Sequence, residues 1–141
     1  MVRLLWYISV LVMVAPLVCH AFCFEEAGAE YGVSPRLLWA IAKAESDFNP
    51  AAMSANTNGT FDYGVMQINS GWYPALGRKR WMHLGDACYN VRTGAWILSQ
   101  CVARHGYTWE AVGCYNASSP GKRARYARKI YRELQKAGAA R

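Results

Sequence analysis

The chain has 141 residues, of which 53% are hydrophobic and 18% charged, and its formal net charge is +7. Without the apolar N-terminal segment described next, about 120 residues remain, which suffice for one compact domain and exclude two. A basic surface of this size suits any anionic polymer, so charge alone does not decide between nucleic acid and a cell-wall or membrane surface.

The first 21 residues have the pattern of a secretory signal peptide. Arg3 gives a positive start, an apolar run covers residues 4–18, and Ala21 supplies the small residue at the cleavage site. Because the run is shorter than the ~20 apolar residues that cross a bilayer and contains Pro16, cleavage is favoured over a retained anchor. We therefore expect a signal peptide over 1–21, a domain over 22–141, and a periplasmic or otherwise exported protein.

Helix start and stop signals recur along the rest of the chain. We expect helices over residues 24–31, from Pro35 to before Pro50, over 86–105, from Thr108, and over 122–136, with a frayed tail over 137–141. Residues 49–62 are rich in Asn, Gly, Ser and Thr, which indicates a loop or short hairpin with Asn58-Gly59 as its turn. The balance predicts an α+β domain that is predominantly α-helical, with a small β-hairpin region.

Four cysteines follow the predicted signal peptide, namely Cys23, Cys88, Cys101 and Cys114. An even number in a small exported domain indicates two disulfides. On one helix, Cys88 and Cys101 would lie roughly 20 Å apart, beyond the ~7 Å limit for a bridge. An antiparallel helix pair would bring Cys101 level with Cys114, so we predict Cys101–Cys114 and, by remainder, Cys23–Cys88. Free thiols or a metal site are the alternatives. The chain lacks a Cys-x-x-Cys pair and a glycine-rich phosphate loop, so we expect neither a metal nor a cofactor.

Glu45 differs from its surroundings in the second predicted helix. It shares a face with Ile41 and Leu38, so an ionisable group lies on an apolar stripe. Burial and a position near the negative end of the helix dipole both favour the neutral acid. A carboxylic acid with a raised pKa is what a glycosidase needs to protonate a leaving oxygen. By periodicity alone, a Glu45 at the helix rim that pairs with Lys43 or with a distant arginine is an equal alternative.

Three ordered motifs carry a resemblance to a known family. Glu45-Ser46 is followed by Gly64-Val65-Met66-Gln67 and then by Tyr115-Asn116. Over roughly residues 23–134 the chain resembles the lysozyme-like lytic transglycosylases that accompany secretion and conjugation machines. The resemblance implies a lysozyme-like fold with a cleft, peptidoglycan glycan strands as the substrate, and components of such an apparatus as partners.

The resemblance also implies roles for individual residues. Glu45 would protonate the glycosidic oxygen and then, as carboxylate, deprotonate the sugar's 6-hydroxyl, which leaves a 1,6-anhydromuramoyl end. Ser46 would help to orient the Glu45 carboxyl, and Tyr115 and Asn116 would face it across the cleft. The other implied substrate-binding residues are Gly64, Met66, Gln67 and Asn69, although a methionine is more typical of a core.

Asp62 leaves the second chemical step open. Residues 45–70 also resemble animal-type lysozymes, in which an aspartate at this spacing is the second catalytic carboxylate. With Asp62 as nucleophile or stabiliser the protein would be a hydrolytic muramidase, and without it a transglycosylase. Asp62 as a turn or N-cap residue is a further interpretation. The Gly64–Gln67 motif favours the transglycosylase. A third hypothesis is a wall-binding assembly factor without turnover, which gains nothing from a buried acid.

Basic residues interleaved with aromatic ones occur at Arg78 to Trp81 and over 122–132. We favour a solvated or wall-binding helix face over nucleic-acid binding for these segments. Trp72 and Tyr73 are the candidates for stacking on sugar rings, whereas Trp96 and Trp109 are predicted to be core residues. We expect a monomer that binds no nucleic acid.

Overall fold

The computed structural model describes residues 22–139, so the predicted signal peptide lies outside the described residues. The elements in chain order are α1 (Phe24–Tyr31), α2 (Pro35–Ser46), β1 (Met53–Ala55), β2 (Phe61–Tyr63), β3 (Ile68–Asn69), the 3-10 turn η1 (Ser70–Trp72), α3 (Tyr73–Trp81), α4 (Ala87–His105), α5 (Trp109–Asn116) and α6 (Pro120–Ala139). This confirms the predicted α+β class with a predominance of helix.

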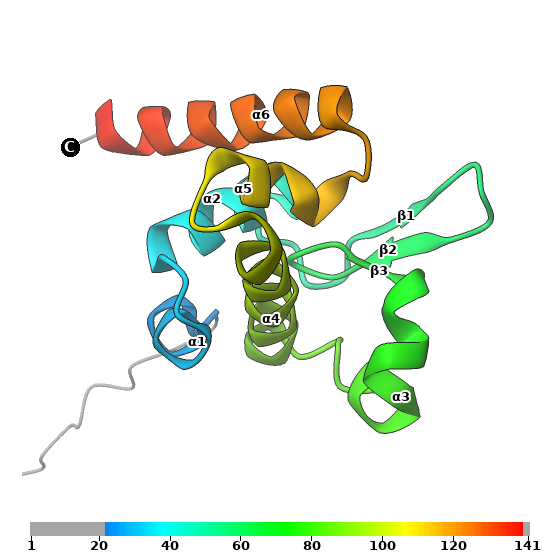
Figure 1. The fold of residues 1–141 in the computed structure, drawn as a ribbon. Helices are drawn as coiled ribbons and strands as arrows, with labels where there is room; N and C mark the ends of the chain where they lie inside the picture. Colours follow the sequence, from blue (N-terminus) through cyan, green and yellow to red (C-terminus); the bar gives the residue numbers. More distant parts are fainter. Residues whose placement is uncertain (1–21, 140–141) are drawn as a thin grey trace, which may run out of the picture.

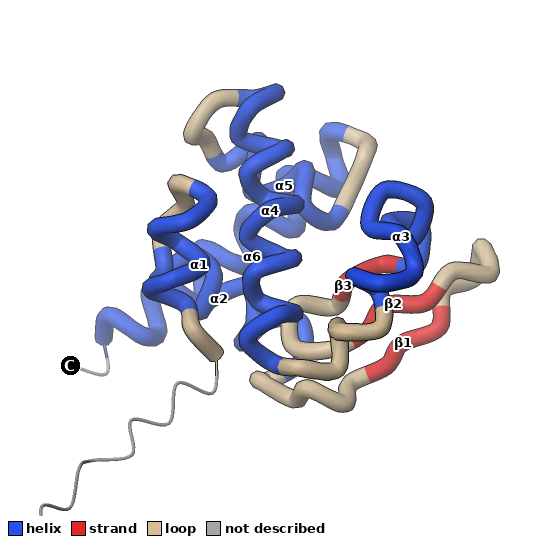
Figure 2. The backbone as a smooth tube through the Cα atoms, turned by 90° about the horizontal axis from the view of Figure 1, so that it is seen from below, coloured by secondary structure: helices blue, strands red, loops and turns tan. Residues whose placement is uncertain are grey.

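Helices and sheet occupy different sides of the domain. Figure 1 shows α4 in the middle, where it packs against α1, α2 and α5, and α6 lying across α2 and α5. Figure 2 shows the sheet and α3 together on the side of α4 that is opposite α1 and α2. The strands form an antiparallel sheet in the order β1-β2-β3, and Asp62 on the central strand lies opposite Ser54 and Asn69. Within residues 22–139, no helix is both long enough and apolar enough to cross a bilayer.

Three helices begin at the predicted residues because a side chain caps each of them. Ser34, Asp86 and Thr108 each accept a hydrogen bond from the backbone N–H three residues later. The first helical position of α2 is Pro35, whose missing N–H would have had no partner there. These starts depend only on neighbours in the sequence, and the sequence therefore predicts them well.

Three features differ from the sequence-based predictions. The helix α3 was not predicted, because its residues form no marked apolar stripe and the dihedrals of Gly77 interrupt it. The last helix continues to Ala139, through positions 137–139 that we expected to fray. Trp109 is 46% exposed rather than a core residue, since it is the first residue of α5 and lies edge-on against Tyr131.

Both predicted disulfides are present. Cys23–Cys88 joins the start of α1 to the start of α4, and Cys101–Cys114 joins α4 to α5. Cross-links of this kind restrict the unfolded chain and typically stabilise a small domain by about 2–4 kcal/mol. The second bridge also lines the cleft described next.

Candidate active site

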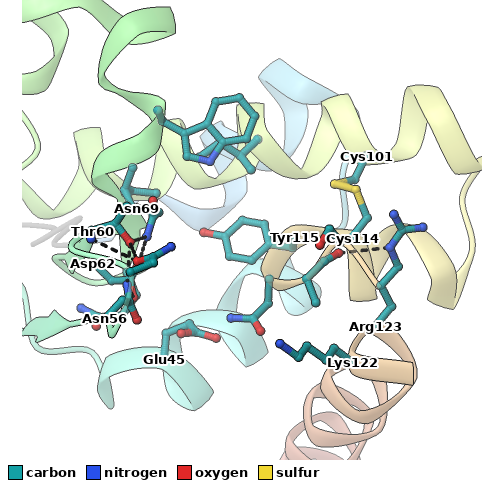
Figure 3. A pocket seen from close by; sticks show the side chains of 18 of the residues that line it. Glu45, Asn56, Thr60, Asp62, Asn69, Cys101, Cys114, Tyr115, Lys122 and Arg123 are labelled. Atoms are coloured by element: carbon teal, nitrogen blue, oxygen red, sulfur yellow. Dashed lines mark hydrogen bonds between the residues drawn. A yellow bond between two sulfur atoms is a disulfide. The ribbon is translucent and has the colours of Figure 1, made fainter. Parts of the chain in front are cut away.

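A cleft of about 820 Å³ lies between the sheet and the helices. Its lining comes from the hairpin, from the segment after it and from α2, α4, α5 and α6, and includes Glu45, Asn56, Thr60, Asp62, Gln67, Asn69, Trp72, Arg104, Tyr115, Asn116, Lys122 and Arg123. Figure 3 shows Glu45 between a polar cluster around Asp62 on one side and Lys122 with Arg123 on the other. The fold thus brings the predicted catalytic and substrate-binding residues to one cleft, except Ser46, Gly64 and Met66, which do not line it.

Glu45 lies near the end of α2, on the face that carries the fully buried Leu38 and Ile41. Its Oε1 atom is buried and has no hydrogen-bond partner within residues 22–139. Burial raises the pKa of this carboxyl, against the lowering effects of the Tyr126 hydroxyl and the Lys129 ammonium, and the Asp62 charge raises it further. The structure therefore favours the protonated acid at the cleft.

The alternative of a rim ion pair does not hold for Glu45. Lys43, the partner considered for it, forms an ion pair with Asp47 one turn further on. Lys43 is therefore engaged elsewhere, and among residues 22–139 no lysine or arginine forms an ion pair with Glu45.

Two tyrosines lie next to Glu45. The rings of Tyr115 and Tyr126 stack with their centroids 6.3 Å apart. Burial, followed by the charge of Glu45, raises the pKa of both hydroxyls well above 10, so both stay protonated. The Tyr126 hydroxyl is buried without a partner in hydrogen-bond geometry among the described residues, yet it is near enough to lower the pKa of Glu45. The acid therefore has a mostly apolar wall with one hydroxyl close to it.

The segment Gly64–Gln67 is fastened to the helices on either side of the cleft. The Ser46 hydroxyl, on α2, donates to the Val65 carbonyl at 2.7 Å. The Tyr115 hydroxyl, on α5, donates to the Met66 carbonyl at 2.8 Å. The Ser46 hydroxyl thus holds this segment, and its orienting effect on the Glu45 carboxyl stays a prediction. The Met66 side chain is fully buried, so it lies beneath the cleft and does not face a substrate.

Asn90, on α4, anchors the same segment from below. This fully buried residue accepts a hydrogen bond from the Met66 N–H at 2.8 Å. Its amide nitrogen donates to the carbonyls of Tyr63 at 3.1 Å and Leu84 at 3.0 Å. Gly64 passes so close that a Cβ there would lie 2.1 Å from the Asn90 Nδ2 atom. The glycine of the motif is therefore required by this contact.

Gln67 braces the floor of the cleft. Its amide nitrogen donates to the carbonyls of Gly64 at 3.0 Å and Ala52 at 3.2 Å, and its Oε1 accepts from the Ser54 hydroxyl at 2.8 Å. Its backbone has a φ of 48°, in the left-handed region that costs a side-chain-bearing residue energy. Such strain is most often retained at functional sites.

Asp62 accepts two hydrogen bonds from side-chain amides. Asn69 donates to its Oδ1 at 2.7 Å, and Asn56 donates to its Oδ2 at 2.9 Å. Asn69 and Asn56 both also donate to the Thr60 hydroxyl, at 3.1 and 3.2 Å. Figure 3 shows the cluster as one group at its end of the cleft. Both carboxylate oxygens are thus held in place on the central strand. Asn69, which was predicted to bind substrate, donates a hydrogen bond to Asp62.

Some residues of the site were not predicted as such. Asn90 and Tyr126 lie on the buried faces of their helices, and a polar group on an apolar stripe is the same signal that identified Glu45. Trp72 lines the cleft as predicted, whereas Tyr73 does not and instead packs edge-on against Trp81. Among residues 22–139 no three His, Cys, Asp or Glu side chains converge as metal ligands.

A mostly helical domain with a small sheet, and a cleft that holds a buried carboxylic acid and a second carboxylate, defines a lysozyme-like domain. The family model described as "Transglycosylase SLT domain" matches residues 22–137. This chain belongs to the SLT transglycosylase family.

Curated relatives cover most of the same length. Protein IpgF of Shigella flexneri is 39% identical over 133 residues, which are 89% of this chain and 88% of the relative. Invasion protein IagB of Salmonella typhimurium is 41% identical over 123 residues, which are 82% of this chain and 77% of the relative. A "Peptidoglycan-binding-like protein" of Escherichia coli O157:H7 is 36% identical over 123 residues, 77% of this chain and 74% of the relative.

Proposed function

We propose that the protein is an exported lytic transglycosylase, which cleaves the β-1,4 bond between MurNAc and GlcNAc in peptidoglycan and leaves 1,6-anhydromuramoyl ends. The observation that carries this proposal is the Glu45 carboxyl, which lines the cleft, has a raised pKa and has a buried oxygen without a hydrogen-bond partner in the described part of the chain. A raised pKa favours the protonated carboxyl, which can give its proton to a leaving oxygen, and the family match supports the reaction class.

Glu45 performs both proton transfers of the proposed reaction. Its carboxyl gives a proton to the glycosidic oxygen while the bond from that oxygen to the muramoyl C1 breaks. The resulting carboxylate then takes the proton of the muramoyl 6-hydroxyl, whose oxygen forms a new bond to C1. Glu45 is regenerated as an acid and no water is consumed. Tyr115 and Tyr126 keep their protons, so Glu45 is the group at this wall that exchanges one.

Hydrolysis with Asp62 is the second candidate function. The observation in its favour is the placement of Asp62 in the cleft, where amides of Asn56 and Asn69 hold both carboxylate oxygens. A fixed carboxylate beside a protonated acid is the pair that a retaining glycosidase uses. In the transglycosylase reaction, Asp62 takes no covalent part and acts on Glu45 through its charge.

Digestion of purified peptidoglycan sacculi distinguishes these reactions. We expect the wild type to release muropeptides with 1,6-anhydro ends, which mass spectrometry separates from reducing ends by the mass of one water. Reducing ends alone would contradict the transglycosylase assignment and favour hydrolysis. No release by a folded protein would favour a wall-binding factor.

Asp62→Asn is expected to retain anhydro-product formation, with a loss of no more than about tenfold, because the proposed mechanism needs no second carboxylate. The Asp62 charge raises the pKa of Glu45, so removing it lowers that pKa. The first step, protonation of the glycosidic oxygen, needs the protonated form of Glu45. The alkaline limb of the pH–rate profile of the variant should therefore move to lower pH. A loss as large as that caused by Glu45→Gln, measured by the same assay, would show a direct catalytic role for Asp62.

We also propose a local role, in which the protein opens gaps in the wall for a secretion, pilus or conjugation apparatus. The similarity to IagB, which is named an invasion protein, supports this role. Export is supported by two disulfides, which form and persist in oxidising compartments.

A further inference from the structure

The lining of the cleft carries charges of both signs, and its basic residues lie away from the Asp62 cluster. Glu45 and Asp62 are its acidic lining residues, whereas Arg104, Lys122 and Arg123 are its basic ones. Figure 3 shows Arg123 near the Cys101–Cys114 bridge and Lys122 on the same side of the cleft, with Tyr115 between these cations and the Asp62 cluster. We call the surface of Arg104, Lys122 and Arg123 the basic end of the cleft.

Two of the three cations at the basic end have no counter-ion among residues 22–139. Arg123 pairs with Glu110 at 2.8 Å and donates to the Ala117 carbonyl at 3.1 Å, so its charge is compensated. Arg104 uses its Nε to reach the Gln100 carbonyl at 3.2 Å and forms no ion pair with a described residue. Lys122 has neither an ion pair nor a hydrogen bond to any of residues 22–139. Arg104 and Lys122 are therefore available to an anionic ligand.

The frame that carries these cations is rigid. The Cys101–Cys114 bridge ties the last turns of α4, which hold Arg104, to α5. Gly113 on α5 lets α6 approach so closely that a Cβ there would lie 2.5 Å from the Arg123 carbonyl oxygen. Because α4, α5 and the start of α6 are locked together, the backbone positions that carry the two free cations are set before a ligand arrives, which lowers the entropic cost of binding.

The chemistry of these groups selects a carboxylate. An arginine and a lysine at one end of a cleft bind a carboxylate by charge-assisted hydrogen bonds. The sugar backbone of peptidoglycan is uncharged, and its carboxylates are those of the stem peptide or, where the peptide has been removed, of the muramoyl lactyl group. We propose that the basic end binds a carboxylate on the substituent of a muramoyl residue. The cleft would then recognise this carboxylate in addition to the sugar backbone of the strand. This inference rests on the proposed peptidoglycan substrate.

The test compares Arg104→Gln/Lys122→Gln with Arg128→Gln/Arg132→Gln, a control that removes two exposed charges from parts of α6 outside the cleft lining. Three soluble substrates are used: strands with stem peptides, strands stripped of peptides by an amidase, and stripped strands whose lactyl carboxylates are converted to methylamides. We expect the cleft variant to raise the KM for strands with their natural carboxylates by about tenfold, with kcat nearly unchanged and the control unaffected. The methylamide strands should not distinguish the two variants.

The outcomes also separate the two sources of the carboxylate. A raised KM on peptide-bearing strands alone assigns the stem peptide, and a raised KM on stripped strands alone assigns the lactyl group. A raised KM on both shows that the basic end takes either carboxylate. An equal effect on the methylamide strands, or no effect on either charged strand, would overturn the proposal.

Binding measured in a Glu45→Gln background keeps this test independent of turnover. Calorimetric affinity for peptide-bearing strands should fall with added salt, and less steeply once Arg104 and Lys122 are replaced. If the wild type cleaves no strand but this binding pattern appears, the proposed reaction fails and the carboxylate site stands. If the wild type cleaves strands but this binding pattern is absent, the proposed reaction stands and the carboxylate site fails.

Discussion

Replacement of Glu45 by glutamine is expected to reduce the release of anhydromuropeptides by at least about 10³-fold, because general acid–base catalysis contributes up to about 10⁴-fold and Glu45 performs both transfers. Glutamine keeps the size of the side chain and cannot donate the proton. Initial rates on sacculi for wild type and variant measure the effect. Glu25→Gln is the matched control, since it makes the same change at an exposed position of α1 and should leave the rate unchanged. An active Glu45→Gln protein would remove Glu45 from the mechanism.

The same variant should be more stable than the wild type at neutral pH. Burial raises the pKa of Glu45 in the folded state from its ordinary value of 4.5. Between these two values the folded protein keeps the proton and the unfolded chain has released it, so the stability of the wild type falls as pH rises through this interval. Glutamine has no such loss. The stability gain should therefore be greatest above the folded-state pKa and smallest below pH 4.5.

Urea unfolding with the disulfides intact, at about pH 3.5 and about pH 7.5, checks this sign. The difference in free energy of unfolding between variant and wild type should grow from the lower to the higher pH. A constant difference would mean that the carboxyl titrates alike in the folded and unfolded chains.

Gly64→Ala is expected to destabilise the protein by more than about 3 kcal/mol. The φ of Gly64 is +81°, a left-handed conformation that costs an L-residue about 1–2 kcal/mol. The new Cβ would lie 2.1 Å from the Asn90 Nδ2, so Asn90 must shift and loosen its hydrogen bonds to Tyr63 and Met66. Each buried polar group left unpaired costs about 1–3 kcal/mol. The free energy of unfolding in urea measures the loss.

Gly59→Ala is the matched control for this prediction. Gly59 has a φ of +83°, yet nothing lies within 4 Å of its added Cβ. It should lose only the backbone cost of about 1–2 kcal/mol. Equal losses at Gly64 and Gly59 would show that the contact with Asn90 contributes nothing.

Much of this protein follows from its sequence through local rules. The caps at Ser34, Asp86 and Thr108 act over three residues, so the helix starts are written in the neighbouring sequence. Helix geometry alone excluded a bridge between Cys88 and Cys101, and the structure forms the two predicted disulfides. The position of Glu45 on an apolar stripe likewise predicted a buried acid with a raised pKa.

Only the tertiary structure decided which distant groups meet. Asn90 holds the Gly64–Gln67 segment, Tyr126 lies beside Glu45, and Arg104 shares the cleft with Lys122. These contacts join residues that are dozens of positions apart or come from different helices, and no periodicity within one element encodes them. The helix α3 was missed for a different reason, because its residues form no marked apolar stripe and Gly77 interrupts it. The exposure of Trp109 follows from its place as the first residue of α5. Local propensity determines where the helices begin, whereas burial and hydrogen bonding between elements determine which side chains surround Glu45.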